Sequence, residues 1–395
     1  MTGDRSILVV NAGSSSIKCG VYPVDGSGRR VGVHCDVGAD GSELVITVAA
    51  EEPIREHLSA ASDGESLWQA ALRLTIDRVV ERGGGPIVAV GHRIVHGGLE
   101  FAAPVVVNPD VLVRIEALGP LAPLHQPQGV AGIHEARRQL PDALQVACFD
   151  TAFHQSCPTE AMRFALPRQW HDAGVRRYGF HGLSYESIVG RLPAVAGVLP
   201  DRLIVAHLGA GASLAAIRSG RSVATTMGFT PLDGLVMATR CGGIDPGAVL
   251  HLICREGFSA AEVERMLTRE SGLLGVSGSS GDMRRLLGSD DPRAAEAVEL
   301  FCYRAVREMG SLVAALGGLD AVVFTAGIGE HAPEIRGRII AGLEWLGLEL
   351  DPAANATHGP RISSLASRVA AWVIPTDEEA VIAAHVRSVA QTPLR

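Results

Sequence analysis

The sequence predicts an α/β protein built from two related domains that face a central cleft. An apolar strand at residues 7–10 runs into a loop of glycine and hydroxyl residues, and a second strand follows at 17–22. Almost half a chain length later, residues 203–208, 209–213 and 214–217 repeat this order of strand, loop and strand. A pattern that recurs at long spacing indicates duplicated units, and strands interspersed with helices indicate α/β layers.

Two later strands support the duplication. Residues 87–95 run toward Gly97 and Gly98, and residues 321–324 run toward the glycines of segment 327–329. Each half therefore has a strand hairpin and a further strand that leads into glycines, as expected for two domains of one design.

Length and composition fit two domains of ordinary size. The chain has 395 residues, 47% of them hydrophobic, with a net charge of -8 and a pI near 6.0. This acidic balance argues against general binding of nucleic acid or of an anionic membrane, because both need a basic face. The seven cysteines have no C-x-x-C spacing, and no apolar run reaches the roughly 18 residues that cross a bilayer. We expect a soluble, cytoplasmic protein.

Capping signals predict the main helices. Asn108 and Pro109 open an amphipathic helix, and the residues after it, 121–127, are expected to form an exposed loop that carries His125. The other helices are expected from Ser259 to Leu267 with a Ser259–Glu262 capping box, over 301–316, and from Asp377 with a Thr376–Glu379 capping box. We place the domains at 1–150 and 151–376, with the last helix, 377–395, returning to the first.

The loop of the first hairpin is the strongest chemical signal. Residues 11–18 read Asn-Ala-Gly-Ser-Ser-Ser-Ile-Lys and combine an amide, a glycine turn, three hydroxyls and one ammonium. Lys18 lies on the polar side of a strand that alternates, whereas a Walker-type loop would open into a helix. These groups suit the terminal phosphates of a nucleotide. The residues alone leave a plain turn equally open, since glycine and serine dominate turns.

Asp150 follows an apolar strand at 146–149. A carboxylate at the carboxyl end of a strand in an open α/β sheet lies where ligands bind. The alternative is an N-cap for the next helix.

Nine motifs in one order carry a family resemblance. They are residues 11–18, 91–98, 121–125, 149–155, 177–182, 226–232, 240–242, 271–275 and 324–330. In this set the chain resembles the acetate and propionate kinases, members of the actin, Hsp70 and sugar-kinase fold. The resemblance implies two actin-like (ribonuclease H-like) domains and a homodimer. It also implies reversible, direct in-line transfer of the γ-phosphoryl group of ATP to acetate with Mg²⁺, or with Mn²⁺ in its place.

The resemblance assigns catalysis to Arg93, Asp150, His181 and Arg240. A carboxylate and a γ-phosphate repel one another, so the site must neutralise charge, and two guanidiniums suit that need. No general base is required, because the attacking carboxylate is ionised at neutral pH. From sequence alone, arginines in ordinary ion pairs would be the better expectation.

Substrate and metal positions follow from the same resemblance. Val95, Leu124, Phe180 and Pro231, with Arg93, match the pocket for the substrate's methyl group, and size exclusion by Val95 favours acetate over propionate.

Asn11 and Glu378 match the positions that hold Mg²⁺, supported by Asp150. The alternative for Glu378 is an acid that stabilises a helix N-terminus.

Further positions correspond to nucleotide and phosphate contacts. They are Ser14, Ser16, Lys18, His125, His207, Gly209, Gly211, Asp282, Arg284, Gly327, Ile328, Gly329 and His331. His125 and His207 retain the alternative of ordinary polar side chains, and Asp282 with Arg284 that of a solvated ion pair.

The chain departs from the family pattern at several amides. Ala210, His331 and Asp377 stand where asparagines are usual, Gln126 follows His125, and Gly243 replaces a frequent aspartate. Ala210 removes a hydrogen-bond donor that faces phosphate, which lowers activity or alters the phosphoryl donor. Two alternatives therefore stay open: a kinase for propionate or another short-chain acid, and a nucleotide-binding regulatory protein with weakened phosphotransfer.

Overall fold

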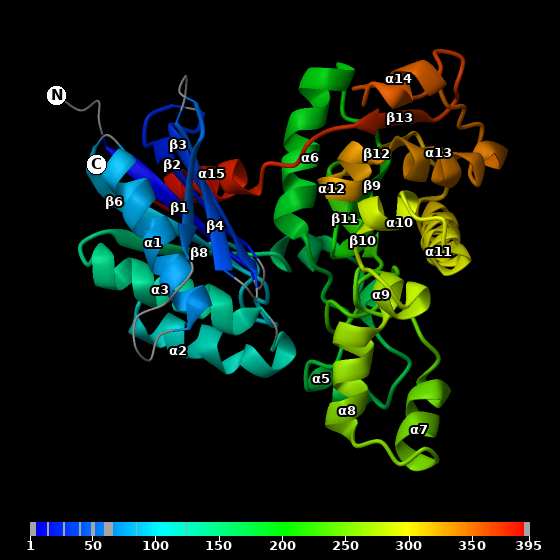
Figure 1. Ribbon diagram of the computed structural model, residues 1–395, viewed down its shortest axis with the longest axis horizontal. Coiled ribbons are helices and arrows are strands. Elements are labelled where there is room, and N and C mark those ends of the chain that lie inside the picture. The colour runs from blue at the N-terminus through cyan, green and yellow to red at the C-terminus, as the bar shows by residue number, and fades with distance from the viewer. Residues whose placement is uncertain are drawn as a thin grey trace. The chain divides into compact units, whose positions relative to one another are not determined.

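The computed structural model describes residues 5–13, 16–26, 28–38, 41–48, 52–58, 66–83, 85–123 and 125–390, with the backbone alone at 38, 41 and 42. It divides into two compact units, Met1–Ala152 with Asp377–Arg395, and Phe153–Thr376 (Figure 1). Within the described residues, no helix has both the length and the apolar character that a membrane span requires.

The first unit contains a mixed sheet in the order β5-β4-β3-β2-β1-β6-β8-β7. Its strands are β1 (Ser6–Ala12), β2 (Ser16–Pro23), β3 (Val31–Gly38), β4 (Gly41–Val48), β5 (Ile54–Leu58), β6 (Ile87–Ile94), β7 (Val105–Val106) and β8 (Leu144–Phe149). Strands β1 to β5 form antiparallel pairs, whereas β1, β6 and β8 run parallel. The predicted hairpin is confirmed, and its register sets Asn11 opposite Lys18.

Helices cover this sheet. They are α1 (Leu67–Arg82), α2 (Pro109–Ala117), the 3-10 turn η1 (Gly119–Leu121), α3 (Gln126–Gln139) and α15 (Glu378–Ala390). Helix α1 packs its apolar face on β2, β3 and β4, and α15 packs on β1 and β6. Gly91 allows this approach, since a Cβ there would lie 2.5 Å from Cγ2 of Ile382 and 2.7 Å from Cγ2 of Val386. The last helix thus docks on the strand that carries Arg93.

The second unit has a sheet in the order β11-β10-β9-β12-β13. Its strands are β9 (Arg202–Leu208), β10 (Ala212–Arg218), β11 (Arg221–Thr225), β12 (Ala321–Thr325) and β13 (Ala370–Val373). Three antiparallel strands are followed by two parallel ones, as in β3-β2-β1-β6-β8. The predicted α/β class and internal duplication are therefore confirmed in the topology.

The helices of the second unit are more numerous. They are η2 (Ala152–Ser156), α4 (Thr159–Met162), α5 (Arg168–Asp172), α6 (Gly182–Ala196), α7 (Pro246–Cys254), α8 (Ala260–Arg265), the π-helical η3 (Met266–Glu270), α9 (Gly272–Ser277), α10 (Met283–Leu287), α11 (Pro292–Leu316), α12 (Ala326–His331), α13 (Pro333–Ala341), η4 (Glu344–Leu346) and α14 (Pro352–Ala356). Helix α6 packs through Tyr185, Ile188 and Leu192 on β9, β10 and β12. Helix α11 contacts β9, β10 and β11.

The capping signals gave mixed results. Asn108 caps α2 through the amide of Val111, and Ser259 forms the expected capping box with Glu262. The long helix α11 begins at Pro292, earlier than expected, because Asp291 caps it.

The expected exposed loop at 121–127 is wrong in part. Ala122 and Gln126 are buried, and Gln126 begins α3. The side chain of Gln126 bonds the backbone of His96 and the carbonyl of Ile115, which draws this segment into the core.

The capping box expected at Thr376 is also wrong. The Asp377 carboxylate accepts from the amide of Ala380 at 3.0 Å and so caps α15. Glu379 instead accepts a hydrogen bond from the Asn11 side chain, while the Thr376 hydroxyl has no partner.

Finally, segment 327–329 lies within the short helix α12 and is not a loop.

Candidate functional site

In the first unit, the ends of β1, β6 and β8 bring together an amide, an arginine and carboxylates. Arg93 forms a bidentate pair with Asp150, with Nη2 2.6 Å from Oδ2 and Nε 3.1 Å from Oδ1. Its Nη1 donates to Oδ1 of Asn11 at 3.2 Å and lies 3.6 Å from Oε2 of Glu378. Four predicted residues from three strands and α15 thus form one cluster.

Asn11 joins the cluster to the N-terminus of α15. Its Nδ2 donates to Oε2 of Glu378 at 3.2 Å and to Oε1 of Glu379 at 3.3 Å. Glu379 is a member that sequence reasoning treated only as a helix cap. Its place in the first turn beside Glu378 gave only a weak signal, because adjacent residues of a helix do not normally face the same point.

Burial sets the electrostatics of this cluster. Burial alone would lower the pKa of Arg93, but the carboxylates of Asp150 and Glu378 outweigh it and raise that pKa. Burial raises the pKa of Asp150, which Arg93 opposes and Glu378 reinforces. The carboxylates of Asp150, Glu378 and Glu379 outnumber the one guanidinium of Arg93, so the cluster has an excess of negative charge on oxygen atoms. A hard divalent cation binds to such oxygen atoms.

The cluster fits a metal that takes most of its ligands from elsewhere. Among the described residues, no group of three or more His, Cys, Asp or Glu side chains is arranged to hold a metal ion. Mg²⁺ keeps several waters and binds through one or two protein oxygens plus phosphates. Asn11 Oδ1 and the Glu378 carboxylate are suitable donors for such a site.

Other predicted residues of the first unit lie around these strands. Ser16 begins β2, and Lys18 is exposed on it. His125 is half-buried at the start of α3, and Val95 is half-buried after β6. Ser14 and Leu124 lie outside the described residues.

In the second unit, His181 is the N-cap residue before α6 and has a left-handed conformation, with φ of 59°. A non-glycine residue with positive φ is uncommon, and strain of this kind persists only where the surroundings fix it. Here the buried His154 ring contacts the backbone just before it, with Nε2 3.0 Å from the carbonyl of Phe180 and Nδ1 2.8 Å from Oγ of Ser222. Gly179, with φ of 75°, allows this ring to approach.

Three basic side chains converge on the loop between β9 and β10. The rings of His181 and His207 stack with centroids 4.1 Å apart and an interplanar angle of 18°. A Cβ at Gly211 would lie 3.4 Å from Nε2 of His181 and 3.7 Å from Nη1 of Arg240. A Cβ at Gly209 would lie 3.9 Å from Nε2 of His207. Nitrogen atoms of all three side chains therefore lie over the loop at 209–211.

Arg240 is fixed from behind. Its Nη1 donates to the carbonyl of Pro231 at 3.0 Å and lies 3.7 Å from the sulfur of Met237. Burial lowers the pKa of Arg240, although an arginine stays charged at neutral pH. Pro231 thus contributes a carbonyl that positions Arg240, and Phe180 is buried beside His181.

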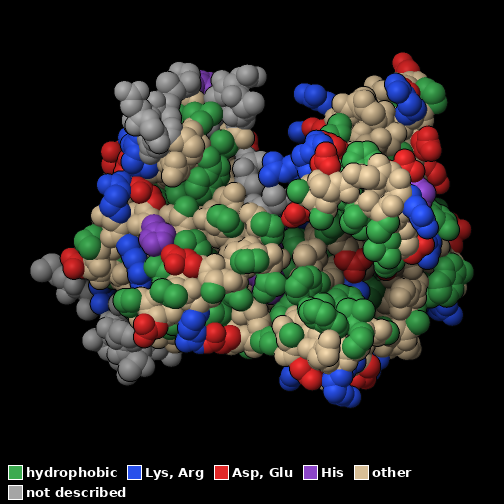
Figure 2. All heavy atoms as spheres, turned by 90° about the horizontal axis from the view of Figure 1, so that it is seen from below, with side chains coloured by type: hydrophobic (Ala, Val, Ile, Leu, Met, Phe, Trp, Pro, Cys, Tyr) green, Lys and Arg blue, Asp and Glu red, His purple; other side chains and the backbone are tan. Residues whose placement is uncertain are grey.

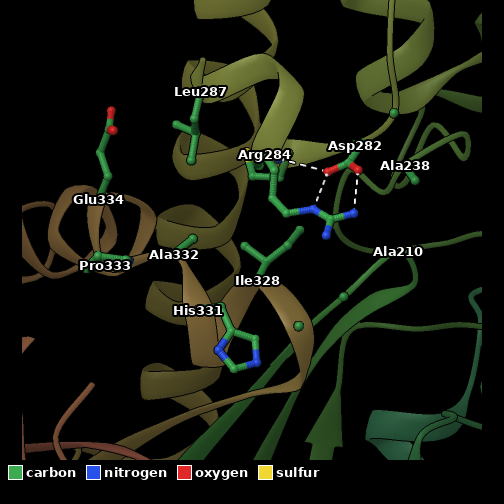
Figure 3. A pocket seen from close by; sticks show the side chains of 14 residues that line it. Ala210, Ala238, Asp282, Arg284, Leu287, Ile328, His331, Ala332, Pro333 and Glu334 are labelled. Carbon is green, nitrogen blue, oxygen red and sulfur yellow. Dashed lines mark hydrogen bonds and ion pairs between the residues drawn. The ribbon is translucent and has the colours of Figure 1, made fainter. Parts of the chain in front are cut away.

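The same loop borders a cavity of about 680 Å³. Figure 3 shows its walls: the 209–211 loop and Ala238 on one side, α10 with Asp282, Arg284 and Leu287 on another, and α12 with Ile328 and His331 below. The wall is largely apolar or glycine, with charged groups at the rim. A cavity of this size and lining suits a planar, largely apolar ring with a polar attachment.

The Asp282–Arg284 ion pair anticipated as the alternative is present at this cavity. Asp282 caps α10 by accepting from the Arg284 amide, and Nη2 of Arg284 lies 2.7 Å from Oδ2 of Asp282. The Arg284 side chain is 90% exposed. The two residues therefore form both a helix cap and part of the cavity wall.

On α12, Gly327 and Ile328 line the cavity, whereas Gly329 is buried behind them. A Cβ at Gly327 would meet nothing within 4 Å, so space there stays open to a ligand. Glu330 folds back to accept from the Ala326 amide at 2.8 Å, which holds the N-terminus of this helix. His331 is exposed at the cavity wall, with Nε2 3.9 Å from Glu330 Oε2.

The structure gives physical roles to two departures from the family pattern. A Cβ at Gly243 would lie 3.6 Å from Oδ1 of Asp233, so an aspartate there would add a second carboxylate beside one that already pairs with Arg177. Ala210 lines the cavity, and its carbonyl accepts from the Ala238 amide at 3.0 Å. Its side chain offers no donor.

Comparison with known proteins gives one family. The family model described as the acetokinase family matches residues 6–384. An acetate kinase of Rhodopseudomonas palustris (strain TIE-1) is 52% identical over 388 residues, covering 96% of this chain and 97% of the relative.

Two solved structures are similar over nearly the whole chain. A propionate kinase of Francisella tularensis has 37% identity and a TM-score of 0.88, covering 96% of this chain and 98% of that one. An acetate kinase of Porphyromonas gingivalis has 36% identity and a TM-score of 0.84, covering 99% and 100%.

The buried His154 predicts a pH-dependent stability. Burial lowers its pKa from 6.5 to about 4, which the hydrogen bond to Phe180 only partly offsets. A base with a depressed folded pKa contributes stability above its unfolded pKa and loses it as pH falls through the window from about 6.5 to about 4. The free energy of unfolding, measured with denaturant, should therefore fall between pH 7 and pH 5 by about 2 kcal/mol less in His154→Gln than in the native chain. Equal pH dependence in both proteins would refute a neutral His154.

Proposed function

The chain belongs to the acetokinase family, and we propose that it transfers the γ-phosphoryl group of ATP to acetate, reversibly and by direct in-line transfer, with Mg²⁺. Membership of this family makes the chain a phosphotransferase with a carboxyl group as acceptor, an acetate kinase. The residue roles, the metal and the assembly below are our proposals.

The convergence of His181 and Arg240 over Gly211 carries the assignment of the phosphoryl site. Nε2 of His181 and Nη1 of Arg240 lie 3.4 and 3.7 Å from the position that a Cβ at Gly211 would take. Preorganised donors of this kind stabilise the charge that develops on transferring oxygens, at no cost of reorganisation. We assign His181 and Arg240 to the phosphoryl oxygens, with His207 and Gly209 on the adjoining phosphate.

Arg93 is assigned to the acceptor. Its Nε and Nη2 form a bidentate bond with Asp150, and this bond fixes the orientation of the guanidinium plane. Acetate is ionised at neutral pH, so charge neutralisation is needed and a base is not. Arg93 and Arg240 would then act on the two anions that must approach each other.

Asn11 and Glu378 are the proposed metal ligands, with Asp150 in support. When bound, Mg²⁺ neutralises charge on the β- and γ-phosphates. Glu379 adds charge to the same cluster through Asn11. Lys18, Ser16, Ser14 and His125 keep their proposed roles near the phosphates.

The nucleoside is assigned to the cavity between α10 and α12. Its wall contains Ile328, Gly327, Asp282, Arg284 and His331. Glycine at 327 leaves room for a flat ring against the helix.

Acetate is the preferred acceptor in this proposal, and propionate is the second candidate because one similar structure is that of a propionate kinase. Burying one additional CH₂ favours binding by about 0.8 kcal/mol, roughly fourfold. A pocket that merely admitted propionate would therefore prefer it. Val95, with Phe180, Pro231 and Leu124, must exclude that carbon by size.

A homodimer is proposed through α7. None of its residues is buried although the segment is apolar, and Ile244, Leu250 and Phe258 are 43%, 60% and 39% exposed. Figure 2 shows hydrophobic side chains gathered on the face of the second unit toward the viewer, the end where α7 lies in Figure 1. A second copy of this chain is the occupant that the family expectation favours. We place the enzyme in the cytoplasm, in keeping with its free cysteines.

The acceptor is decided by an acid panel. Acetate, propionate and butyrate are assayed by trapping the acyl phosphate with hydroxylamine, using ATP, GTP and pyrophosphate as donors. We expect the highest kcat/KM with acetate and ATP. A higher value for propionate would establish the second candidate, and ATP binding without acyl phosphate from any acid would indicate a regulatory protein.

Filling the space over Gly211 should block transfer. Gly211→Ala adds a methyl group between His181 and Arg240 without a backbone clash, and Gly211 does not have a left-handed φ. We expect folding to persist and kcat to fall about 100-fold or more, the cost of a displaced oxyanion contact. Gly190→Ala on α6, which meets nothing within 4 Å, is the matched control. Comparable turnover in the two variants would contradict the site.

The proposed dimer interface can be tested by introducing a charged side chain into it. Leu250→Glu should convert the dimer into a monomer with little loss of stability, because Leu250 is exposed. Val113→Glu, at an equally exposed position on α2, should stay dimeric. Sedimentation velocity measures both. A monomeric native chain, or a dimeric Leu250→Glu variant, would disprove this interface.

A further inference from the structure

Behind His181 lies a chain of two buried hydroxyls that the proposed transfer does not use directly. Oγ of Ser213 lies 2.8 Å from Nδ1 of His181 and 2.5 Å from the hydroxyl of Tyr185. Ser213 and Tyr185 are both fully buried. Ser213 belongs to β10 and Tyr185 to the first turn of α6, so two rigid elements hold this chain in place.

The single proton of Ser213 decides which nitrogen of His181 carries hydrogen. If Ser213 donates to Nδ1, the neutral ring has its proton on Nε2. If Ser213 donates to Tyr185 instead, Nδ1 must be the donor, and a neutral ring then has a bare Nε2. The contact between the two hydroxyls is short, and a phenol is the stronger donor of the pair, which favours the order Tyr185 to Ser213 to His181.

The orientation of Nε2 makes this choice matter. Nε2 is the atom of His181 that lies nearest the open space over Gly211, 3.4 Å from a Cβ there. Phosphoryl oxygens are acceptors, so a bare nitrogen in this place would repel them, whereas Nε2–H would bond them. The wrong histidine tautomer is a known way to lose turnover while geometry persists.

We propose that Tyr185 and Ser213 are positioning residues that fix the tautomer of His181 with its proton on Nε2, toward the transferring phosphoryl group. The inference rests on the proposed phosphoryl site. The Tyr185 hydroxyl reaches the imidazole through Ser213, because Ser213 lies between them. The stacked His207 has a parallel arrangement, with Nδ1 2.8 Å from Oγ of Ser184, and both rings thereby turn Nε2 to the loop.

The test is a double-mutant cycle on the full chain. Ser213→Ala removes the donor to Nδ1 and should lower kcat about 10- to 100-fold, the range known for partners that orient metal-binding histidines, with the KM for acetate nearly unchanged. Tyr185→Phe leaves the Ser213 proton and should cost less. The double variant should be about as slow as Ser213→Ala, because Ser213 is the link between the Tyr185 hydroxyl and Nδ1 of His181. Thr75→Ala, which also removes a buried hydroxyl but on α1, controls for a general loss of packing.

Nitrogen NMR of histidine-labelled protein supplies a readout that is independent of turnover. The ring-nitrogen shifts of His181, assigned by comparison with His181→Asn, should show hydrogen on Nε2 in the native chain. That measurement stands if Ser213→Ala does not fold, and it stands if no acid is phosphorylated, in which case the proposed function alone has failed. Hydrogen on Nδ1 in the native chain, additive losses in the double variant, or a Ser213→Ala kcat within twofold of native would each overturn the relay.

Discussion

The register of the central strands is the constraint on which the side-chain cluster of each unit depends. Val10 pairs with His92 across β1 and β6, and Ile94 pairs with Phe149 across β6 and β8. Asn11, Arg93 and Asp150 follow at the carboxyl ends of these strands, so a shift of one residue in any ladder would turn one of them to the other face. In the second unit, His207 lies opposite both Ser213 and Thr325. The same topology therefore places a charged cluster in one unit and stacked imidazoles in the other.

Burial explains why these groups keep defined positions. A buried charge without partners is costly, and Arg93 meets this cost through three side chains that also orient it. The second unit has another such arginine, Arg336, which is fully buried and donates to the carbonyls of Gly329, Glu330 and Asn355. None of these partners is a carboxylate, and burial lowers the pKa of Arg336 to about 10. These bonds hold the C-terminal end of α12, the helix that lines the cavity.

The sequence predicted elements where one local signal dominated. The hairpin at Asn11–Lys18 followed from alternation, and α2 from the Asn108 cap. Prediction failed where residues had two partners to choose from. Glu379 could cap a helix or bond Asn11, and it does the latter because β1 brings Asn11 within reach, a contact between residues 368 positions apart. Tyr185 lay in no motif, and Ser213 was only the last residue of the segment 209–213, since a buried hydroxyl looks like ordinary core polarity until its neighbours are known.

The missing asparagine amide at position 210 must be weighed against the nitrogen atoms that already face the loop at 209–211. An asparagine there would add one neutral hydrogen bond at the edge of the cavity. The loop already faces Nε2 of His181, Nε2 of His207 and Nη1 of Arg240, and a hydrogen bond from the charged Arg240 is about twice as strong as a neutral one. Ala210 offers no amide that could take the place of His181, so a His181 ring with its proton on the wrong nitrogen would leave that hydrogen bond unmade. A chain with Ala210 therefore depends more heavily on the group that keeps the His181 proton on Nε2, which we propose is the Ser213 hydroxyl.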